Sequence, residues 1–204
     1  MAALRFDFIS LGICLPAVQI GNLHSSKSIQ YPLSLQLLNR KGEPIERHIV
    51  LVAPEIHWNT GNIGRTCLAT GAYLHLIKPL GFSLDSHAVK RAGLDYWDRV
   101  KLTLWEDFGK FESEMAPRKD QVAVFSKKGA APFWSLPAAE RLFLIFGSET
   151  KGLPENILQK YAHATYHIPI TTDTRSLNLS TAAGIALYES LRPAKPFHGW
   201  PPDK

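Results

Sequence analysis

The sequence predicts an α/β domain with a mainly parallel sheet and helices on both faces. Two observations lead to this prediction. Short apolar or β-branched runs recur through residues 48–147, and each ends near Gly, Pro or a polar turn. Segments with the helical spacing of apolar residues lie between these runs, so strand and helix alternate along the chain. Ligands of such sheets bind beyond the carboxyl ends of the strands, and a site is expected there.

Each expected strand is a short apolar run bounded by turn residues. In chain order the expected strands are HIVLVAP (48–54), YLHLIKP (73–79), VKLTL (100–104), QVAVF (121–125) and LFLIFG (142–147). The expected helices follow the spacing of their apolar residues and lie at 63–70, 86–92, 107–115, 155–161 and 179–191.

The length of 204 residues and the apolar content of 45% suffice for one compact domain plus an appendage. Residues 1–46 differ from the rest because an apolar stretch at 8–20 is interrupted by Pro16 and followed by polar residues. This segment could be a tail, a leader or an over-long gene start. We therefore expect an amino-terminal extension at 1–46, a domain at 47–192 and a carboxyl-terminal tail at 193–204.

Charge and cysteine content bear on partners and compartment. The formal net charge of +5 favours an anionic partner such as nucleic acid. Cys14 and Cys67 show neither CxxC nor metal-ligand spacing, which is typical of a reduced compartment, and a cytoplasmic location is expected. The amino-terminal apolar run is too short to span a bilayer, and Asp7 weakens its resemblance to a secretory signal. No membrane association is expected.

Three stretches are dense in Gly, Asn, Ser and Thr between apolar runs: WNTGNIGRTCLATG (58–71), IFGSETKGLP (145–154) and IPITTDTRSLNLSTAAGIALYE (168–189). Such residues let backbone amides and small hydroxyls approach a ligand closely. All three stretches follow or flank expected strands, so we expect them to form one shared site. Neither the GxGxxG fingerprint nor a GK[ST] phosphate loop follows any strand, which excludes the two commonest nucleotide sites of α/β folds.

Together with KRAGLDYWDRV (90–100), these stretches resemble, in their order, the SPOUT class of RNA 2'-O-methyltransferases over about residues 48–192. Within that class the chain is most similar to the small enzymes that act on the wobble nucleotide of tRNA. The resemblance implies a deep trefoil knot at the carboxyl end, S-adenosyl-L-methionine as the cofactor, S-adenosyl-L-homocysteine as its product, no metal, and a homodimer. It also implies methylation of the ribose 2'-hydroxyl of nucleotide 34, a cytidine or modified uridine in the anticodon loop, with tRNA-Leu as the expected species.

The resemblance also assigns roles to individual residues. It implies catalytic roles for Arg65, Glu149, Ser176 and Asn178, and cofactor contacts for Phe125, Gly147, Ile168 and Ser176. Gly147 lacks a Cβ and so permits close approach of the backbone. Ile168 is held extended by the proline that follows it, so its main chain can present hydrogen-bonding groups to the adenine.

Arg65 matches the arginine that this class uses to activate the hydroxyl. Arginine stays protonated at ordinary pH, so it is a poor candidate for a literal base. We expect its guanidinium to bind the neighbouring phosphate and to stabilise the developing alkoxide, unless a phosphate oxygen takes the proton.

The residues expected to contact RNA are Asn59, Arg65, Lys127, Lys128 and Tyr188. Further basic candidates are Lys78, Lys90, Arg91, Arg99 and Lys151, although any single one of these can be an ordinary solvated cation. Trp58 is a second aromatic candidate, besides Tyr188, for stacking on an unpaired base. Relatives usually carry a small residue or proline where this chain has His57 and Trp58, so substrate choice can differ here.

Simpler structural interpretations stay open for several of these residues. Asn and Ser commonly form turns and cap helices, which is an alternative for Asn59, Asn62, Ser176, Asn178 and Ser180. Glu149 and Lys151 can form a surface ion pair of little energetic consequence. His163 and His167 have the i, i+4 spacing of a metal pair, but they lead into a strand without a carboxylate partner and are interpreted as structural or exposed.

Two alternative functions remain at this stage. One is a 2'-O-methyltransferase acting on ribosomal RNA, although larger relatives of that type often carry an added amino-terminal RNA-binding domain. The other is a knotted RNA-binding module that has lost its chemistry.

Overall fold

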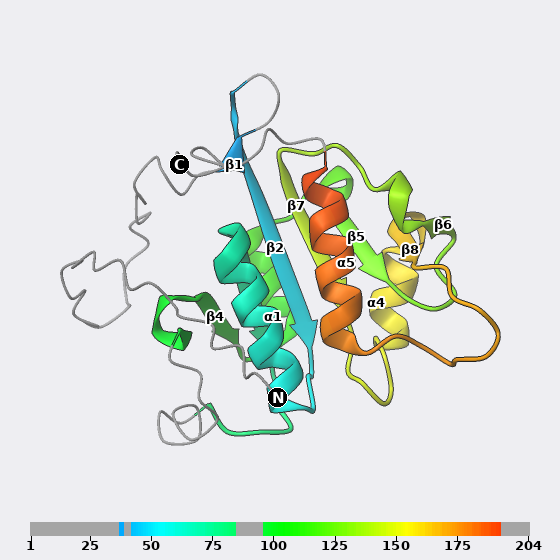
Figure 1. Cartoon of the computed structure of the whole chain (residues 1–204), viewed down its shortest axis with the longest axis horizontal. Coiled ribbons are helices and arrows are strands. Elements are labelled where there is room, and N and C mark those ends of the chain that lie inside the picture. Colours follow the sequence, from blue (N-terminus) through cyan, green and yellow to red (C-terminus); the bar gives the residue numbers. More distant parts are fainter. Residues whose placement is uncertain (1–36, 39–41, 85–95, 193–204) are drawn as a thin grey trace, which may run out of the picture. The chain divides into compact units, whose positions relative to one another are not determined.

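The computed structural model describes residues 37–38, 42–84 and 96–192, all of which belong to one compact unit, Tyr31–Lys204 (Figure 1). The expected helix at 86–92, the tail at 193–204, Cys14, Lys90 and Arg91 lie outside the described residues. Among the helices of the described ranges, none has the length and apolar character needed to cross a lipid bilayer.

A parallel sheet forms the centre of this unit. Seven parallel strands lie in the order β4-β3-β2-β7-β5-β8-β6, and β1 pairs antiparallel with β2. The strands are β1 (Leu37–Leu38), β2 (Pro44–Val52), β3 (Tyr73–Ile77), β4 (Lys101–Trp105), β5 (Val122–Phe125), β6 (Ala131–Pro132), β7 (Arg141–Phe146) and β8 (Thr165–His167). The predicted mainly parallel sheet is confirmed.

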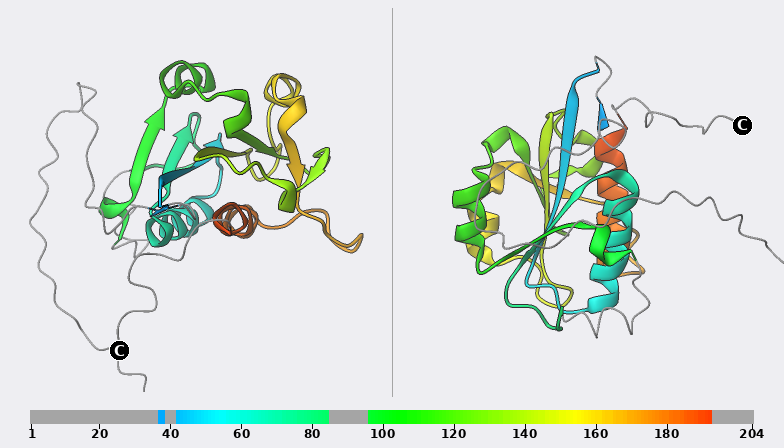
Figure 2. Two further views of the ribbon diagram at one scale, coloured as in Figure 1. Left: turned by 90° about the horizontal axis from the view of Figure 1, so that it is seen from above. Right: turned by 90° about the vertical axis from the view of Figure 1, so that its left-hand side faces the viewer.

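Helices cover both faces of this sheet, as predicted (Figure 2). The α-helices are α1 (His57–Thr70), α3 (Phe108–Met115), α4 (Glu155–Lys160) and α5 (Leu179–Leu191). Short 3-10 turns lie at η2 (Trp97–Arg99), η3 (Lys119–Gln121), η4 (Phe133–Ser135) and η5 (Ala162–Ala164). Figure 2 shows α1 and α5 side by side on one face, with α3 and α4 on the other.

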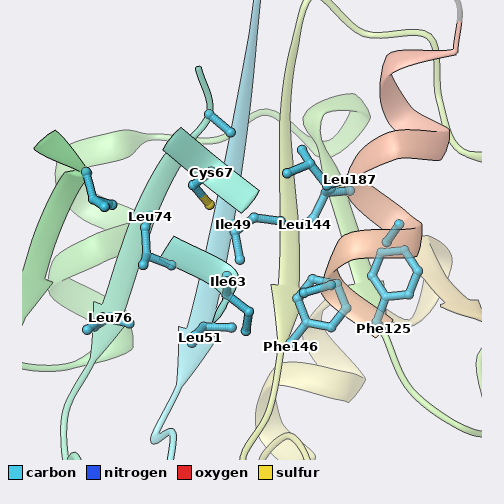
Figure 3. Packing of buried hydrophobic residues seen from close by; sticks show 14 of the residues in the cluster. Ile49, Leu51, Ile63, Cys67, Leu74, Leu76, Phe125, Leu144, Phe146 and Leu187 are labelled. Carbon is cyan, nitrogen blue, oxygen red and sulfur yellow. The ribbon is translucent and has the colours of Figure 1, made fainter. Parts of the chain in front are cut away.

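The alternation of side chains along β2 explains the two layers of core. Ile49 and Leu51 point to the face that α1 and α5 cover, whereas Val50 and Val52 belong to the cluster under α3 and α4 (Figure 3). All four side chains are buried, and burial of each is worth roughly 1.5–3 kcal/mol. These β2 residues are apolar on both faces of the sheet. Such a continuous hydrophobic run is expected of a central parallel strand.

Helix α1 begins at His57, six residues before the predicted start at 63. The prediction was late because Asn59, Gly61 and Asn62 interrupt the helical pattern, and all three residues have low helix propensity. The structure shows what Gly64 provides: a Cβ there would lie 2.7 Å from the Cζ3 atom of Trp97. Close packing of the 96–97 segment on α1 therefore requires a residue without a side chain.

Other elements also differ from expectation. Strands β1, β6 and β8 were not predicted, because β1 and β6 contain two residues each and β8 three. Strand β2 begins at Pro44, within the segment assigned to the amino-terminal extension.

A buried arginine joins β2 to the end of α5. Arg47 donates from Nε and Nη2 to the Ser190 carbonyl at 3.2 and 3.0 Å, and from Nη1 to the Glu46 and Glu140 carbonyls at 2.9 and 3.0 Å. Burial lowers the pKa of Arg47 to about 10, so the guanidinium stays charged near neutral pH. These bonds satisfy a carbonyl in the last turn of α5 and fix the helix against the sheet.

Candidate active site

The three motif loops meet at the carboxyl ends of the parallel strands. The chain leaves β2 through residues 53–56 into α1, leaves β7 through residues 147–154 into α4, and leaves β8 through residues 168–178 into α5. In Figure 1 the β2 arrow points to the start of α1, and α5 starts at the same end of the sheet. This edge is where parallel α/β sheets bind ligands.

A chain of side-chain hydrogen bonds joins all three loops. Asn178 Nδ2 donates to Asn59 Oδ1 at 2.9 Å, and Asn59 Nδ2 donates to Glu149 Oε1 at 2.9 Å. Each of these residues comes from a different motif, separated by 119 and 90 positions in the sequence. The first expectation from the sequence, that the motifs converge, therefore agrees with the geometry.

Glu55 and Glu149 form a reciprocal latch between the loops after β2 and β7. The Glu55 amide donates to Glu149 Oε2 at 2.8 Å, while Thr150 donates to the Glu55 carboxylate from its amide at 3.2 Å and its hydroxyl at 2.7 Å. Glu149 therefore accepts hydrogen bonds from Asn59 and the Glu55 amide, in place of the surface ion pair with Lys151 that was considered from the sequence. Sequence reasoning missed Glu55 and Thr150, although a carboxylate directly after a buried strand was a usable signal.

The turn that carries Glu55 is conformationally unusual. Ala53 adopts φ 50°, a left-handed conformation that a residue with a Cβ seldom takes. The Ala53 amide donates to the Ile77 carbonyl at 3.0 Å, and the Gly81 amide donates to the Pro54 carbonyl at 2.9 Å. The loop after β3 therefore holds the loop after β2 in this shape, consistent with strain stored beside a functional site.

Asn178 both caps a helix and takes part in the site. Its Oδ1 accepts from the Ser180 amide at 2.8 Å and the Thr181 amide at 3.4 Å, which satisfies free amides of α5. The same side chain donates to Asn59, so the two interpretations considered for Asn178 hold together. Asn59 and Asn62 do not cap α1, because both lie inside the helix and Ile56 occupies the N-cap position.

The 148–152 turn after β7 explains Gly147. Ser148 and Gly152 exchange backbone hydrogen bonds at 3.2 and 3.0 Å, and a Cβ on Gly147 would lie 2.0 Å from the Gly152 carbonyl carbon. Gly147 is therefore required for the turn itself. A contact between its backbone and a cofactor stays a prediction.

Of the expected cofactor residues, Phe125 and Gly147 lie at the ends of β5 and β7, and Ile168 packs against the core cluster that contains Phe125. The ring of Phe125 stacks on Phe146 with centroids 4.7 Å apart, and partly buried Ile168 packs against the same cluster. The loop after β5 is pinned to β8, because His167 Nδ1 lies 2.8 Å from the Gly129 carbonyl oxygen. Ser176 is exposed, and among the described residues no hydrogen bond joins its side chain to Asn59 or Glu149.

Arg65 is exposed on α1, two helical turns beyond the start of the helix. Its Cζ atom lies 4.6 Å from the centroid of the Tyr96 ring. Within the described part of the chain, no hydrogen bond or ion pair engages its guanidinium, so the N–H donors remain available. Sequence reasoning assigned no role to Tyr96.

The residues expected to contact RNA lie on several elements of the described unit. Lys127 and Lys128 are exposed in the turn after β5, Tyr188 is 54% exposed on α5, and Trp58 is 62% exposed on α1. Asn59 differs because it is 2% exposed. A direct RNA contact through its amide would require its bonds to Asn178 and Glu149 to open.

The remaining candidates have ordinary surroundings. Lys78 pairs with Glu106 at 2.7 Å on the surface, Arg99 is exposed in η2, and His163 is exposed in η5. Among the described residues, no group of three or more His, Cys, Asp or Glu side chains is placed to hold a metal ion.

Comparison with known proteins agrees with this fold and geometry. The SpoU rRNA Methylase family matches residues 46–188. A Listeria monocytogenes protein, provisionally named a tRNA (cytidine(34)-2'-O)-methyltransferase, is 47% identical over 146 residues, which cover 71% of this chain and 86% of the relative. A solved structure described as giving insights into 2'-OH methylation of C/U34 on tRNA is 44% identical, covers 73% of this chain and 96% of its own, and superposes with a TM-score of 0.65.

A further solved structure shares the fold at lower identity. It is the SpoU methyltransferase AviRb from Streptomyces viridochromogenes in complex with AdoMet, 22% identical with a TM-score of 0.60, and the match covers 71% of this chain and 59% of that one. With the family match extending from β2 into α5, the chain belongs to the SpoU rRNA methylase family.

Proposed function

We propose that this protein transfers a methyl group from S-adenosyl-L-methionine to the ribose 2'-hydroxyl of nucleotide 34 of a tRNA. The observation that carries the proposal is the hydrogen-bonded chain Asn178–Asn59–Glu149, which joins three loops from distant parts of the sequence beside the helix that bears Arg65. The name of the Listeria relative and the subject of the 44% identical structure support the same substrate.

The apolar group at the ends of β5 and β7 fits the cofactor. An adenosyl group needs an apolar slot for its ring and main-chain groups for its edge. Phe125 and Phe146 supply stacked rings, and Ile168 adds a partly buried apolar side chain. The chemistry that S-adenosyl-L-methionine supplies when bound is an electrophilic methyl group. Phe125, Gly147, Ile168 and Ser176 would hold it, and no metal is required.

Arg65 is the residue assigned to the substrate hydroxyl. Its permanently charged guanidinium can bind the phosphate beside the reacting ribose and stabilise negative charge as the hydroxyl oxygen loses its proton. Fixing that phosphate also orients the ribose, and good orientation of reactants can contribute on the order of 7–11 kcal/mol.

Glu149 and Asn178 act in this proposal by positioning the loops. Both carboxylate oxygens of Glu149 already accept hydrogen bonds, from Asn59 Nδ2 and the Glu55 amide. Neither oxygen is left without a protein donor, which argues against Glu149 as the base. The proton of the ribose hydroxyl then goes to a phosphate oxygen or to water.

The anticodon loop is the proposed RNA partner, with tRNA-Leu as the expected species. Lys127 and Lys128 would neutralise phosphates, which makes binding salt-dependent. The exposed aromatic faces of Tyr188 and Trp58 suit unpaired bases. The Trp58 position distinguishes this chain from relatives with smaller residues there.

A trefoil knot and a homodimer belong to the same proposal. Strand β8 lies beyond β5, yet α5 returns to pack against α1, β2 and β7, and this return supports a threaded carboxyl end. The proposed methyltransferase domain spans 47–192, to which the structure adds the start of β2 at Pro44. The proposed location is the cytoplasm.

An assay with labelled methyl donor tests the proposal. Purified protein is incubated with tRNA or with ribosomal RNA, using wild type and Arg65→Lys. We expect label in tRNA only, and a large loss in Arg65→Lys because lysine keeps the charge but loses the planar fork. Label in ribosomal RNA alone would favour that alternative substrate, and binding of tRNA and S-adenosyl-L-homocysteine without turnover would favour the non-catalytic module. Near-normal turnover by Arg65→Lys would refute bidentate recognition.

A further inference from the structure

The segment KRAGLDYWDRV contributes to the family resemblance but has no role in the site described so far. Its described part begins at Tyr96 and leads through η2 into β4. Tyr96 and Trp97 both pack on α1, the helix that carries Arg65. The contacts of Tyr96 are specific enough to suggest a function.

Tyr96 is fixed on α1 at both ends of its side chain. Its hydroxyl donates to the Gly61 carbonyl at 2.9 Å in a buried setting, and the residue is only 4% exposed. Its ring lies 4.6 Å from Arg65 Cζ. Gly61 and Arg65 are four residues apart, so they are neighbours on one face of the helix. The neighbouring Trp97 fills the space beside Gly64, which holds the whole segment against α1.

This contact orients Arg65 without pairing its guanidinium with any of the described residues. A guanidinium within about 6 Å of an aromatic centroid is attracted to the ring. The ring engages the guanidinium without using its N–H donors, and within the described ranges no acceptor is bonded to them. An arginine that is restrained before binding loses less side-chain freedom when it captures an anion. The arrangement is therefore suited to presenting a planar set of donors to a phosphate.

We propose that Tyr96 is a positioning residue for Arg65: its ring holds the guanidinium in the orientation that methyl transfer requires. The inference rests on the proposed function of Arg65. The competing interpretation is that Tyr96 only fills the core beneath α1. The two differ in one respect, since a core residue affects activity whether or not Arg65 is present, and a positioning residue acts only through Arg65.

A double-mutant cycle separates the two interpretations. We would measure methylation kinetics and thermal unfolding for wild type, Tyr96→Phe, Tyr96→Leu, Arg65→Ala and the Tyr96→Leu/Arg65→Ala double variant. Tyr161→Leu is the matched control, because Tyr161 is also a buried tyrosine with a nearby cation, Lys160, on the opposite face of the sheet. The KM for S-adenosyl-L-methionine is measured throughout.

Tyr96→Leu is expected to lower kcat about tenfold with the KM for cofactor within about twofold. Tyr96→Phe, which keeps the ring, is expected to retain most of the activity. In the Arg65→Ala background, Tyr96→Leu should change kcat no further, and Tyr161→Leu should lower the melting temperature without coupling to Arg65. An equal loss of kcat from Tyr96→Leu in both backgrounds, or none in either, would overturn the inference.

An NMR measurement on the wild-type protein covers the case in which Tyr96→Leu does not fold. The ring current of Tyr96 should shift the Arg65 Nε–H proton away from the usual arginine position, with the signal assigned by its loss in Arg65→Lys. An unshifted proton would overturn the inference. This readout needs no methylation, so failure of the proposed RNA chemistry can be told apart from failure of the Tyr96 contact.

Discussion

At the scale of single residues, the Glu149 carboxylate connects the parts of the site by hydrogen bonds. One oxygen accepts from Asn59 and the other from the Glu55 amide, so this carboxylate joins the loop after β7 to the segment after β2, and Asn59 extends the connection to Asn178. In turn, the Glu55 carboxylate accepts hydrogen bonds from the amide and the hydroxyl of Thr150. Each oxygen of this carboxylate accepts a hydrogen bond from an N–H donor. If one oxygen were replaced by an NH₂ group, as in glutamine, one of these pairs would place two donors against each other.

Glu149→Gln tests these hydrogen bonds. We expect a loss of about 1–3 kcal/mol in the free energy of unfolding, since a buried donor is left unsatisfied. The methylation rate should fall as well, because the loops lose their alignment. Chemical denaturation and methylation kinetics measure the two effects, with exposed Glu155→Gln on α4 as the control. Wild-type stability and rate in Glu149→Gln would show that the latch is dispensable.

Trp58 is the second aromatic residue, besides Tyr188, proposed to stack on an unpaired base. Its side chain is 62% exposed, with His57 edge-on at 4.7 Å between ring centroids. Trp58→Ala should weaken tRNA binding by about 1–3 kcal/mol if the indole stacks on a base. Filter binding at fixed salt measures this, with Trp134→Ala as the matched control because Trp134 is 55% exposed in η4. Equal affinity for both variants would remove Trp58 from the RNA interface.

The sequence indicated most polar residues of the site but not their partners. Asn59, Glu149 and Asn178 were singled out because the resemblance to the SPOUT class implies roles at these motif positions. The start of α5 at Leu179 was predicted correctly, whereas α1 begins six residues before its predicted start. The motifs alone did not specify which side chains meet across them. Tyr96 was missed because its role arises from a contact with a residue 31 positions earlier, and one sequence does not reveal such a pairing.

At the scale of elements, a row of buried rings crosses β2, β3 and β4. Trp105 Nε1 donates to His75 Nδ1 at 3.1 Å, so the His75 proton is on Nε2 and is donated to His48 Nδ1 at 2.9 Å. His48 then carries its own proton on Nε2, 3.4 Å from Glu46 Oε2. Each neutral imidazole fits this row of hydrogen bonds in one tautomer only. An additional proton on His75 would face the indole N–H of Trp105.

This row predicts a loss of stability in mild acid. Burial lowers the pKa of His48 and lowers that of His75 well below its ordinary value. Near pH 6.5 the unfolded chain therefore binds protons at these two histidines, whereas the folded chain does not. The folded state has its full stabilisation above that pH, and this stabilisation is lost as the pH falls toward the folded-state pKa values. From pH 7 to pH 5 the free energy of unfolding should fall by up to about 1.4 kcal/mol per pH unit for each such histidine.

His75→Gln is the variant that checks the assignment. Its amide can accept from Trp105 and donate to His48 without titrating, so the slope of stability against pH should become shallower. His163→Gln, a substitution on an exposed side chain, is the control. Chemical denaturation at several pH values measures both, and an unaltered slope in His75→Gln would show that acid acts elsewhere.

The long apolar elements could be predicted from sequence, and the short or glycine-containing ones could not. Strands β2, β3, β4, β5 and β7 were recognised because each is an apolar run between turn residues. The first two turns of α1 were missed because Asn59, Gly61 and Asn62 have low helix propensity, and tertiary packing of Tyr96 and Trp97 overrides it. Strand β8 owes its pairing to β5 and β6 rather than to its own pattern.

At the scale of the whole molecule, the alternation of strand and helix gave the layers and the edge that holds the site. The strand order, with β2 and β7 adjacent at the centre, did not follow from the pattern. The order matters because it places the loops after β2 and β7 next to each other, which permits the Glu55–Glu149 latch.

The proposed homodimer is a separate whole-molecule prediction. The chain mass is 22.8 kDa, so a dimer should sediment at about twice that mass at micromolar protein. Analytical ultracentrifugation over a range of concentrations measures it. A single species at the mass of one chain would contradict the prediction.

The most direct test of the account is to locate the methyl group. The protein is incubated with methyl-labelled S-adenosyl-L-methionine and total tRNA, and the modified nucleotide is mapped by mass spectrometry of nuclease fragments. We predict label on the ribose of nucleotide 34 and a large loss of that label when Arg65 is replaced by alanine. Label on a base, or on a ribose at another position, would contradict it.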